Sequence, residues 1–257
     1  MSSIKPQGMP SVAFWTTAGV EVPAVTTDQM REIDRIAMED TGPNLFQMME
    51  NAGRNLASLA MELLGAEWSK AAYVVLAGPG GNGGGGICAA RHLANRGLQV
   101  RLCLTDPAGL GEVPAFQRKV FQGTFGQEIS PAELASEHPN VVLDAVFGYG
   151  LKSAPRGASA DVINWANEST APVLALDIPS GLDATTGEAR SIFINARWTM
   201  TLALPKTGLT SDRIGELFLA DIGIPAETYR RMGLKYIDPF QNRYWMSLKS
   251  QSARAAQ

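Results

Sequence analysis

The chain has 257 residues, of which 45% are hydrophobic and 18% are charged, as in an ordinary globular protein. Its formal net charge of −3 has the wrong sign for a protein that binds nucleic acid by neutralising phosphates, so we expect no nucleic-acid partner. No run approaches the roughly 20 apolar residues that cross a membrane, and the N-terminus lacks a secretory signal pattern. We therefore expect a cytoplasmic protein without membrane association.

The N-terminal part of the chain predicts an arm followed by two helices. Residues 1–24 mix Pro, Gly, Ser and Thr with scattered aromatic residues and predict an extended arm. Apolar residues at helical spacing begin after Thr27, and a second such pattern follows Asn44 and stops near Gly65. His92, further along the chain, is interpreted as a structural residue. Cys88 and Cys103 lie in separate apolar runs and predict buried thiols without a disulfide.

From residue 72 onward, short apolar runs alternate with helical patterns. The runs predict strands over 72–77, 98–104, 141–143, 173–176, 198–204 and 216–220, and the intervening patterns predict helices over 87–95, 113–122, 158–167 and 226–231. Buried strands that alternate with helices indicate a mostly parallel sheet covered on both faces. We therefore predict a three-layer α/β/α Rossmann-like domain over residues 25–236. Residues 237–257 show no readable pattern and predict a loose tail.

Three loops leave the predicted carboxyl ends of strands, where open parallel sheets bind their ligands. The first loop, residues 78–86, is rich in glycine, which lets a ligand approach the backbone, and the helix behind it offers N–H groups to a phosphate. The second loop begins at Asp144 and the third at Asp177, so two carboxylates stand at strand ends. The glycine spacing does not match the usual dinucleotide fingerprint, and no acidic residue ends the next strand.

These segments resemble the YjeF N-terminal domain family, whose characterised members are NAD(P)HX epimerases. The resemblance covers residues 25–229. It rests on the glycine loop and on six further motifs: MENAG at 49–53, AARHL at 89–93, DAVFGYG at 144–150, DIPSGLD at 177–183, LPKTGL at 204–209 and ADIGIP at 220–225. Lys206 belongs to one of these motifs, but the sequence does not define its role.

The resemblance implies that the chain interconverts the R and S forms of hydrated NADH and NADPH. It assigns a potassium site to the oxygen atoms of Asn82, Asp144 and Ser180, which suit a hard cation, and it makes Asp177 the candidate acid/base. It implies that the dinucleotide substrate is bound by residues of all three loops, namely Gly81, Asn82, Gly83, Gly84, Gly85, Gly148, Tyr149, Gly150, Leu151, Lys152, Ser153, Ala154 and Asp177. The resemblance is compatible with a homodimer and with a separate dehydratase partner. In the family the dehydratase is a kinase-like domain, and we expect the residues beyond Tyr229 to be too few to form one.

The glycine loop departs from the family pattern at two positions, because Gly81 and Gly85 replace Asn and Asp. The departure leaves two hypotheses open: a working epimerase, and a non-catalytic dinucleotide-binding or scaffold member of the same family. A nicotinamide-dependent oxidoreductase is disfavoured by the missing fingerprint. Because consecutive glycines lose much backbone entropy on ordering, we expect a mobile loop at 83–86, and we expect Gly81→Asn with Gly85→Asp to strengthen ligand binding.

Overall fold

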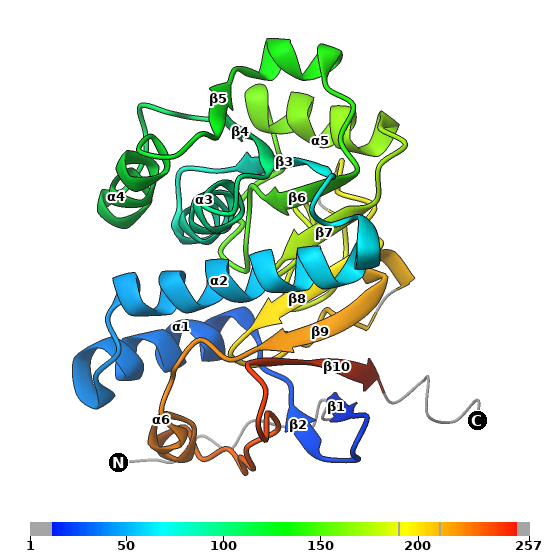
Figure 1. The fold of residues 1–257 in the computed structure, drawn as a ribbon. Coiled ribbons are helices and arrows are strands. Elements are labelled where there is room, and N and C mark those ends of the chain that lie inside the picture. The colour runs from blue at the N-terminus through cyan, green and yellow to red at the C-terminus, as the bar shows by residue number, and fades with distance from the viewer. Residues whose placement is uncertain (1–11, 190, 211, 251–257) are drawn as a thin grey trace.

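The computed structural model describes residues 12–189, 191–210 and 212–250, and their strands form one sheet (Figure 1). In chain order the strands are β1 (Ala13–Thr16), β2 (Glu21–Pro23), β3 (Ala72–Ala77), β4 (Gln99–Leu104), β5 (Gln127–Ile129), β6 (Val141–Ala145), β7 (Val173–Leu176), β8 (Trp198–Leu202), β9 (Glu216–Ala220) and β10 (Trp245–Ser250). Their order across the sheet is β2-β1-β10-β9-β8-β7-β6-β3-β4-β5.

Helices connect these strands. They are α1 (Thr27–Ile36), a π-helix (Ala37–Thr41), α2 (Leu45–Leu63), α3 (Gly81–Ala94), α4 (Glu112–Phe121), α5 (Ala158–Glu168), α6 (Ala226–Arg231) and the 3₁₀ helices Gly65–Glu67, Pro131–Ser136 and Asp212–Ile214. Both α1 and α2 begin with capping boxes, made by Thr26 with Gln29 and by Asn44 with Gln47. Within the described ranges, no helix has the length and apolar character needed to span a membrane.

The sheet is parallel from β5 across to β9, whereas β10, β1 and β2 are antiparallel to their neighbours. After β3 the chain first builds β4 and β5 on one side and then returns to place β6 on the other side. The order therefore reverses between β3 and β6. Such a reversal opens a crevice beyond the carboxyl ends of the two strands, where doubly wound folds bind ligands.

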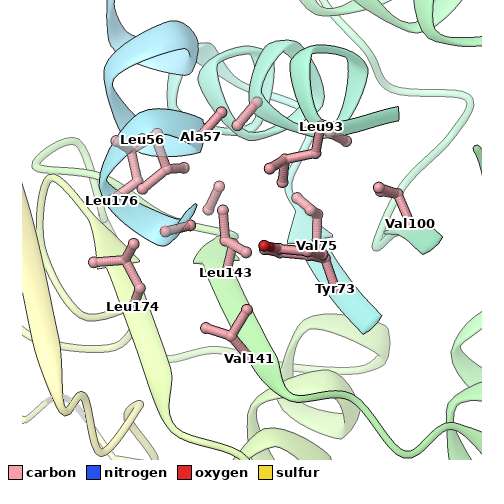
Figure 2. Packing of buried hydrophobic residues seen from close by; sticks show 14 of the residues in the cluster. Leu56, Ala57, Tyr73, Val75, Leu93, Val100, Val141, Leu143, Leu174 and Leu176 are labelled. Atoms are coloured by element: carbon pink, nitrogen blue, oxygen red, sulfur yellow. The ribbon is translucent and has the colours of Figure 1, made fainter. Parts of the chain in front are cut away.

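Helices cover both faces of this sheet. On one face, side chains of α2 and α3 pack against β3, β6 and β7 (Figure 2). Leu56 of α2, Leu93 of α3 and Leu143 of β6 belong to this buried cluster. On the other face, Val162 and Ile163 of α5 join a separate buried cluster with alternate residues of β3 and β6. Because both faces are covered, β3 and β7, in the middle of the sheet, are almost entirely apolar. The predicted three-layer α/β/α fold with a mostly parallel sheet is confirmed.

The two ends of the chain differ from the sequence expectation. β10 lies inside the sheet, paired with β9 and β1, so the prediction of a loose tail was wrong for residues 245–250. Met246 and Leu248 are buried and alternate with more exposed residues, which is the period of a strand covered on one face. In the predicted arm, residues 13–16 and 21–23 form a hairpin at the sheet edge. Residues 1–11 of that arm and 251–257 of that tail lie outside the described residues.

The glycine-rich segment also differs from the expectation, because residues 81–86 form the first turns of α3 rather than a mobile loop. Glycine is a poor helix former, but close packing requires it here. A Cβ added to Gly84 would lie 2.4 Å from Sδ of Met49 on α2, and one added to Gly86 would lie 2.4 Å from Cβ of Ala145 on β6. Tertiary packing therefore outweighs the local preference, and the helix starts earlier than the predicted residue 87.

Candidate active site

The first two predicted loops meet at the crevice between β3 and β6. The backbone N–H of Gly78, which follows β3, donates to the carbonyl oxygen of Ala145 over 3.1 Å. A Cβ on Gly78 would lie only 2.1 Å from the carbonyl oxygen of Val146. Glycine is therefore required at this position by direct backbone contact between the loops.

Asp144 and Ser180, both fully buried, join the end of β6 to the third loop. Asp144 lies inside β6, which extends to Ala145, so the second loop begins later than predicted. The Ser180 hydroxyl donates to Oδ1 of Asp144 over 2.6 Å, and the Ser180 backbone N–H donates to Oδ2 over 2.8 Å. Burial raises the pKa of Asp144 to about 6, although hydrogen bonds from Ser180 and Val146 oppose the shift. The carboxyl group is thus costly to ionise without a nearby positive charge.

Asn82 adds an unsatisfied oxygen to the same crevice. Its side-chain Nδ2 donates to the carbonyl oxygen of Leu176 over 3.1 Å, whereas its Oδ1 is buried and accepts no hydrogen bond from the described residues. A Cβ on Gly148 would lie 3.2 Å from the Asn82 side chain and 3.1 Å from Oδ2 of Asp177. A buried acceptor without a donor is uncommon. The side-chain oxygens of Asn82, Asp144 and Ser180 are an amide, a carboxylate and a hydroxyl oxygen, which are the ligand types that a hard cation prefers.

Asp177 follows β7 directly and adopts a left-handed backbone conformation, with φ of 67°. Such a conformation is unusual for a residue other than glycine and occurs often at functional sites. The Asp177 Oδ1 lies 2.5 Å from Nζ of Lys206, and its Oδ2 accepts the backbone N–H of Tyr149 over 2.9 Å. Both oxygens of this buried carboxylate are therefore held by donors from other loops.

Lys206 is a site residue whose role the sequence did not define. Its ammonium group is almost completely buried, donates to the carbonyl oxygen of Leu202 over 2.9 Å, and lies 5.7 Å from the ring centre of Tyr149. Tyr149 in turn donates a short hydrogen bond from its hydroxyl to Asp34 on α1. Asp34 was also missed by sequence reasoning, because an acidic residue on an amphipathic helix gives no functional signal.

The structure brings only some of the predicted substrate-binding residues together. Asn82, Gly148, Tyr149 and Asp177 lie together at the crevice, and Gly81 is exposed on the first turn of α3. In contrast, the neighbouring glycines are buried in helix packing, where an added Cβ would meet other protein atoms; they are Gly83, Gly84 and Gly85. In the second loop Lys152 and Ser153 are exposed, whereas Leu151 and Ala154 are partly buried.

A second polar cluster links α2 to α3 outside this crevice. Glu50, Cys88 and His92 present three groups that could hold a metal ion, but the guanidinium of Arg91 lies among them. Its Nη2 is 2.5 Å from Glu50 Oε2, 3.3 Å from the Cys88 sulfur and 3.4 Å from His92 Nε2. Arg91 thus supplies the positive charge of the cluster. Burial raises the pKa of Cys88 to about 12, so its thiol is inert, and His92 is structural as predicted.

Comparison with known proteins assigns this chain to a family. Residues 45–208 match the family described as YjeF-related protein N-terminus. The NAD(P)H-hydrate epimerase of Dehalogenimonas lykanthroporepellens is 46% identical over 239 residues, which cover 93% of this chain and 98% of that protein. The bifunctional NAD(P)H-hydrate repair enzyme Nnr of Moorella thermoacetica is 34% identical over 214 residues, covering 78% of this chain and 40% of that protein. The crystal structure of yeast YNL200c matches 88% of this chain and 100% of its own with a TM-score of 0.78 at 21% identity, which supports the fold. The chain belongs to the YjeF-related N-terminal family.

Proposed function

We propose that this chain is an isomerase that interconverts the R and S forms of hydrated NADH and NADPH. The relative that is 46% identical bears the name NAD(P)H-hydrate epimerase, and the match extends over nearly all of both chains. The structural observation that carries the proposal is the buried Asp177–Lys206 pair, which lies at the carboxyl end of the parallel strands beside Asn82 and Gly148. A charged pair in this position is typical of a reacting centre.

The chemistry of the substrate fits a carboxylate at this position. The hydrated ring carries a hydroxyl on the carbon next to its nitrogen, and inversion requires that the hydroxyl leaves and returns or that the ring opens and closes. Both routes need proton transfer, and loss of the hydroxyl places positive charge on the ring. Asp177 would act as the acid/base and stabilise that charge, while Lys206 and the Tyr149 N–H fix its two oxygens.

The remaining crevice would bind the dinucleotide. Gly81 and Asn82 open α3, whose free N–H groups and dipole suit a phosphate of the substrate. Gly148 borders the same region, and the segment 148–154 that it begins would form the opposite wall. The buried Gly83, Gly84 and Gly85 would contribute indirectly, because they allow α3 to approach its neighbours closely.

A potassium ion would be bound by Asn82, Asp144 and Ser180. The orphan Oδ1 of Asn82 and the buried carboxylate of Asp144 support this assignment, since each lacks the positive partner that a cation would supply. Such an ion would neutralise Asp144 and join the three loops.

Two further features of the protein's setting are proposed from its relatives. This chain spans about 40% of the bifunctional repair enzyme, so a second activity resides in the rest of that protein. We propose that a separate dehydratase partner consumes one epimer produced by this chain, and that both act in the cytoplasm.

A non-catalytic, dinucleotide-binding role is the second candidate function. The replacement of the family Asn and Asp by Gly81 and Gly85 favours it.

The test begins with one purified epimer of hydrated NADH and follows the other by chromatography. The parent protein should bring the two epimers to equilibrium. Asp177→Asn should lower the rate by about 10²–10⁴-fold, because asparagine keeps the shape without a titratable proton. Asp161→Asn, on the exposed face of α5, is the matched control and should retain full activity. Tight binding without turnover by the parent would favour the non-catalytic alternative.

A further inference from the structure

Inversion through loss of the hydroxyl demands proton transfer on both faces of the substrate ring. That this chain inverts hydrated NADH and NADPH is the proposed function, on which this inference rests. The hydroxyl departs from one face as water, and a second water adds to the other face. Glycosidases that invert an analogous carbon use two carboxyl groups, one as acid and one as base. Asp177 alone is poorly suited to both tasks, because Lys206 and the Tyr149 N–H fix its two oxygens in one orientation.

Asp34 is the other carboxyl group that shares this environment. Its Oδ2 accepts the Tyr149 hydroxyl, while no hydrogen bond of its Oδ1 is found among the described residues. Tyr149 joins the two carboxyl groups physically, since its backbone N–H contacts Asp177 and its ring lies beside Lys206. The charges of Asp177 and Lys206 also act on Asp34: the lysine lowers the pKa of its carboxyl group and the aspartate raises it.

Asp144 cannot take this role. Its side chain is completely buried, and both of its oxygens already accept hydrogen bonds from Ser180, with a further bond from the Val146 N–H. Asp34, in contrast, is only partly buried and sits on α1, beside the loop that carries Tyr149. Burial raises the pKa of Asp34, which favours a carboxyl group that holds a proton.

We propose that Asp34 is the second acid–base group of this site and that Tyr149 is its positioning residue. Asp34 donates its proton to the departing hydroxyl, the carbon–oxygen bond breaks with its electron pair on the oxygen, and water leaves. The ring nitrogen's lone pair forms the C=N bond of a planar cation. A second water then attacks the opposite face and transfers a proton to Asp177, so that the water lost equals the water gained. Proton exchange with solvent restores Asp34 and Asp177.

The charges of the site balance during this step. Before reaction, protonated Asp34 is neutral and Asp177 is paired with Lys206. Once Asp34 has given its proton, two carboxylates face one ammonium group, and the surplus negative charge matches the positive charge on the ring. Stabilising charge where it develops is a major source of catalysis. The same two groups exchange roles in the reverse direction, as microscopic reversibility requires.

The test compares Asp34→Asn with Asp28→Asn, a carboxylate on the first turn of the same helix whose side chain is 90% exposed. Asp34→Asn should lower kcat by about 10²-fold or more while KM changes by only a few-fold. Asp28→Asn should match the parent. In water enriched in ¹⁸O, each inversion by the parent should place a solvent oxygen in the product, and retention of the original oxygen would overturn the mechanism.

Tyr149→Phe provides a second, milder test because it keeps the ring beside Lys206 and removes only the hydroxyl. The groups that face Asp34 are Tyr149, Asp177, Lys206 and Tyr229. Arg31, on the same helix as Asp34, acts on Tyr149 and pairs with Asp28. Loss of the hydroxyl donor should raise the pKa of Asp34, so the alkaline limb of the kcat/KM profile should move to higher pH. In Asp34→Asn that limb should disappear.

The outcomes separate this inference from the proposed function. If the parent does not interconvert the epimers, the proposed function fails and this inference fails with it. If the parent is active and Asp34→Asn turns over within a few-fold of it, only the role of Asp34 is overturned. Should Asp34→Asn unfold, an alkaline limb in Tyr149→Phe that coincides with the parent's would overturn the role of both residues.

Discussion

Nζ of Lys206 lies 2.5 Å from Oδ1 of Asp177, and the two side chains are only 1% and 4% exposed. The pair connects the loop after β7 to the segment after β8 at the ligand-binding end of the sheet. Because water cannot solvate either charge, each depends on the other for its stability. The pair therefore couples the folding of this region to the chemistry proposed for Asp177.

Removing the ammonium group should destabilise the protein. Lys206→Met leaves the Asp177 carboxylate buried without its partner, so the free energy of unfolding measured with urea should fall by about 3–5 kcal/mol. Combining it with Asp177→Asn should restore part of that loss, because no buried charge remains. The exposed Lys152→Met serves as the control. A double variant less stable than Lys206→Met would contradict this account.

Potassium should stabilise the parent more than sodium at equal ionic strength. Asp144→Ala removes the anionic group from the proposed cation site, so we expect it to abolish the difference between the two salts in thermal melting. At a potassium concentration well above its Kd, the bound ion should add about 1–3 kcal/mol to the free energy of unfolding. Asp161→Ala, which is exposed on α5, should keep the salt effect. Equal melting of the parent in both salts, with unchanged activity in Asp144→Ala, would argue against the site.

Restoring the family residues in the glycine segment should destabilise the protein at position 85 and be tolerated at position 81. A Cβ on Gly85 would lie 2.8 Å from Cδ2 of the fully buried Leu176, so Gly85→Asp alone should cost about 1–3 kcal/mol of stability through overpacking. Adding Leu176→Val removes the clashing atom and should recover part of the loss. Gly81→Asn should be tolerated, since the position is exposed and its nearest contact is Met49 at 3.5 Å.

These variants revise the expectation drawn from sequence. A gain in affinity for hydrated NADH is now expected from Gly81→Asn, or from Gly85→Asp only when Leu176→Val accompanies it. Isothermal titration and thermal melting measure the two effects separately. If Gly85→Asp alone proves as stable as the parent, the packing argument is wrong.

The link between α2 and α3 should be sensitive to acid. Burial raises the pKa of Glu50, but hydrogen bonds from Arg91 and His92 outweigh it and bring the pKa to about 2, below the ordinary 4.5. The ionised carboxylate therefore stabilises the fold fully above pH 4.5, and this contribution is lost as the pH falls towards about 2. Because the side chain is 41% exposed, screening reduces the effect to about 1–2 kcal/mol.

Glu50→Gln should accordingly lower the free energy of unfolding by about 1–2 kcal/mol at pH 7. Its deficit relative to the parent should shrink between pH 4.5 and 2. Glu62→Gln, on the exposed side of the same helix, should show neither effect. A deficit that stays constant with pH would indicate lost packing rather than lost charge.

The sequence by itself determined the fold class and the ends of β3 and β7, two of the strands that carry the site, whereas β6 runs two residues past its predicted end to Ala145. The predicted strands 72–77, 173–176 and 216–220 match β3, β7 and β9 residue for residue, and helix 226–231 matches α6. Apolar runs and breaks are local signals, because a strand buried on both faces must be apolar along its own length. For the same reason the three loops that follow β3, β6 and β7 could be placed before any contact was known.

Only the tertiary structure decided how the site is assembled. Lys206 meets Asp177 across 29 positions and Tyr149 meets Asp34 across 115, so neither pair has a signal in a local window. The glycines at 81–86 became helical, and β10 entered the sheet, because packing against distant segments outweighed weak local preferences. Burial and charge in the folded state determine which residues far apart in the chain interact. The proposed acid–base groups therefore follow from the tertiary structure and not from the local sequence.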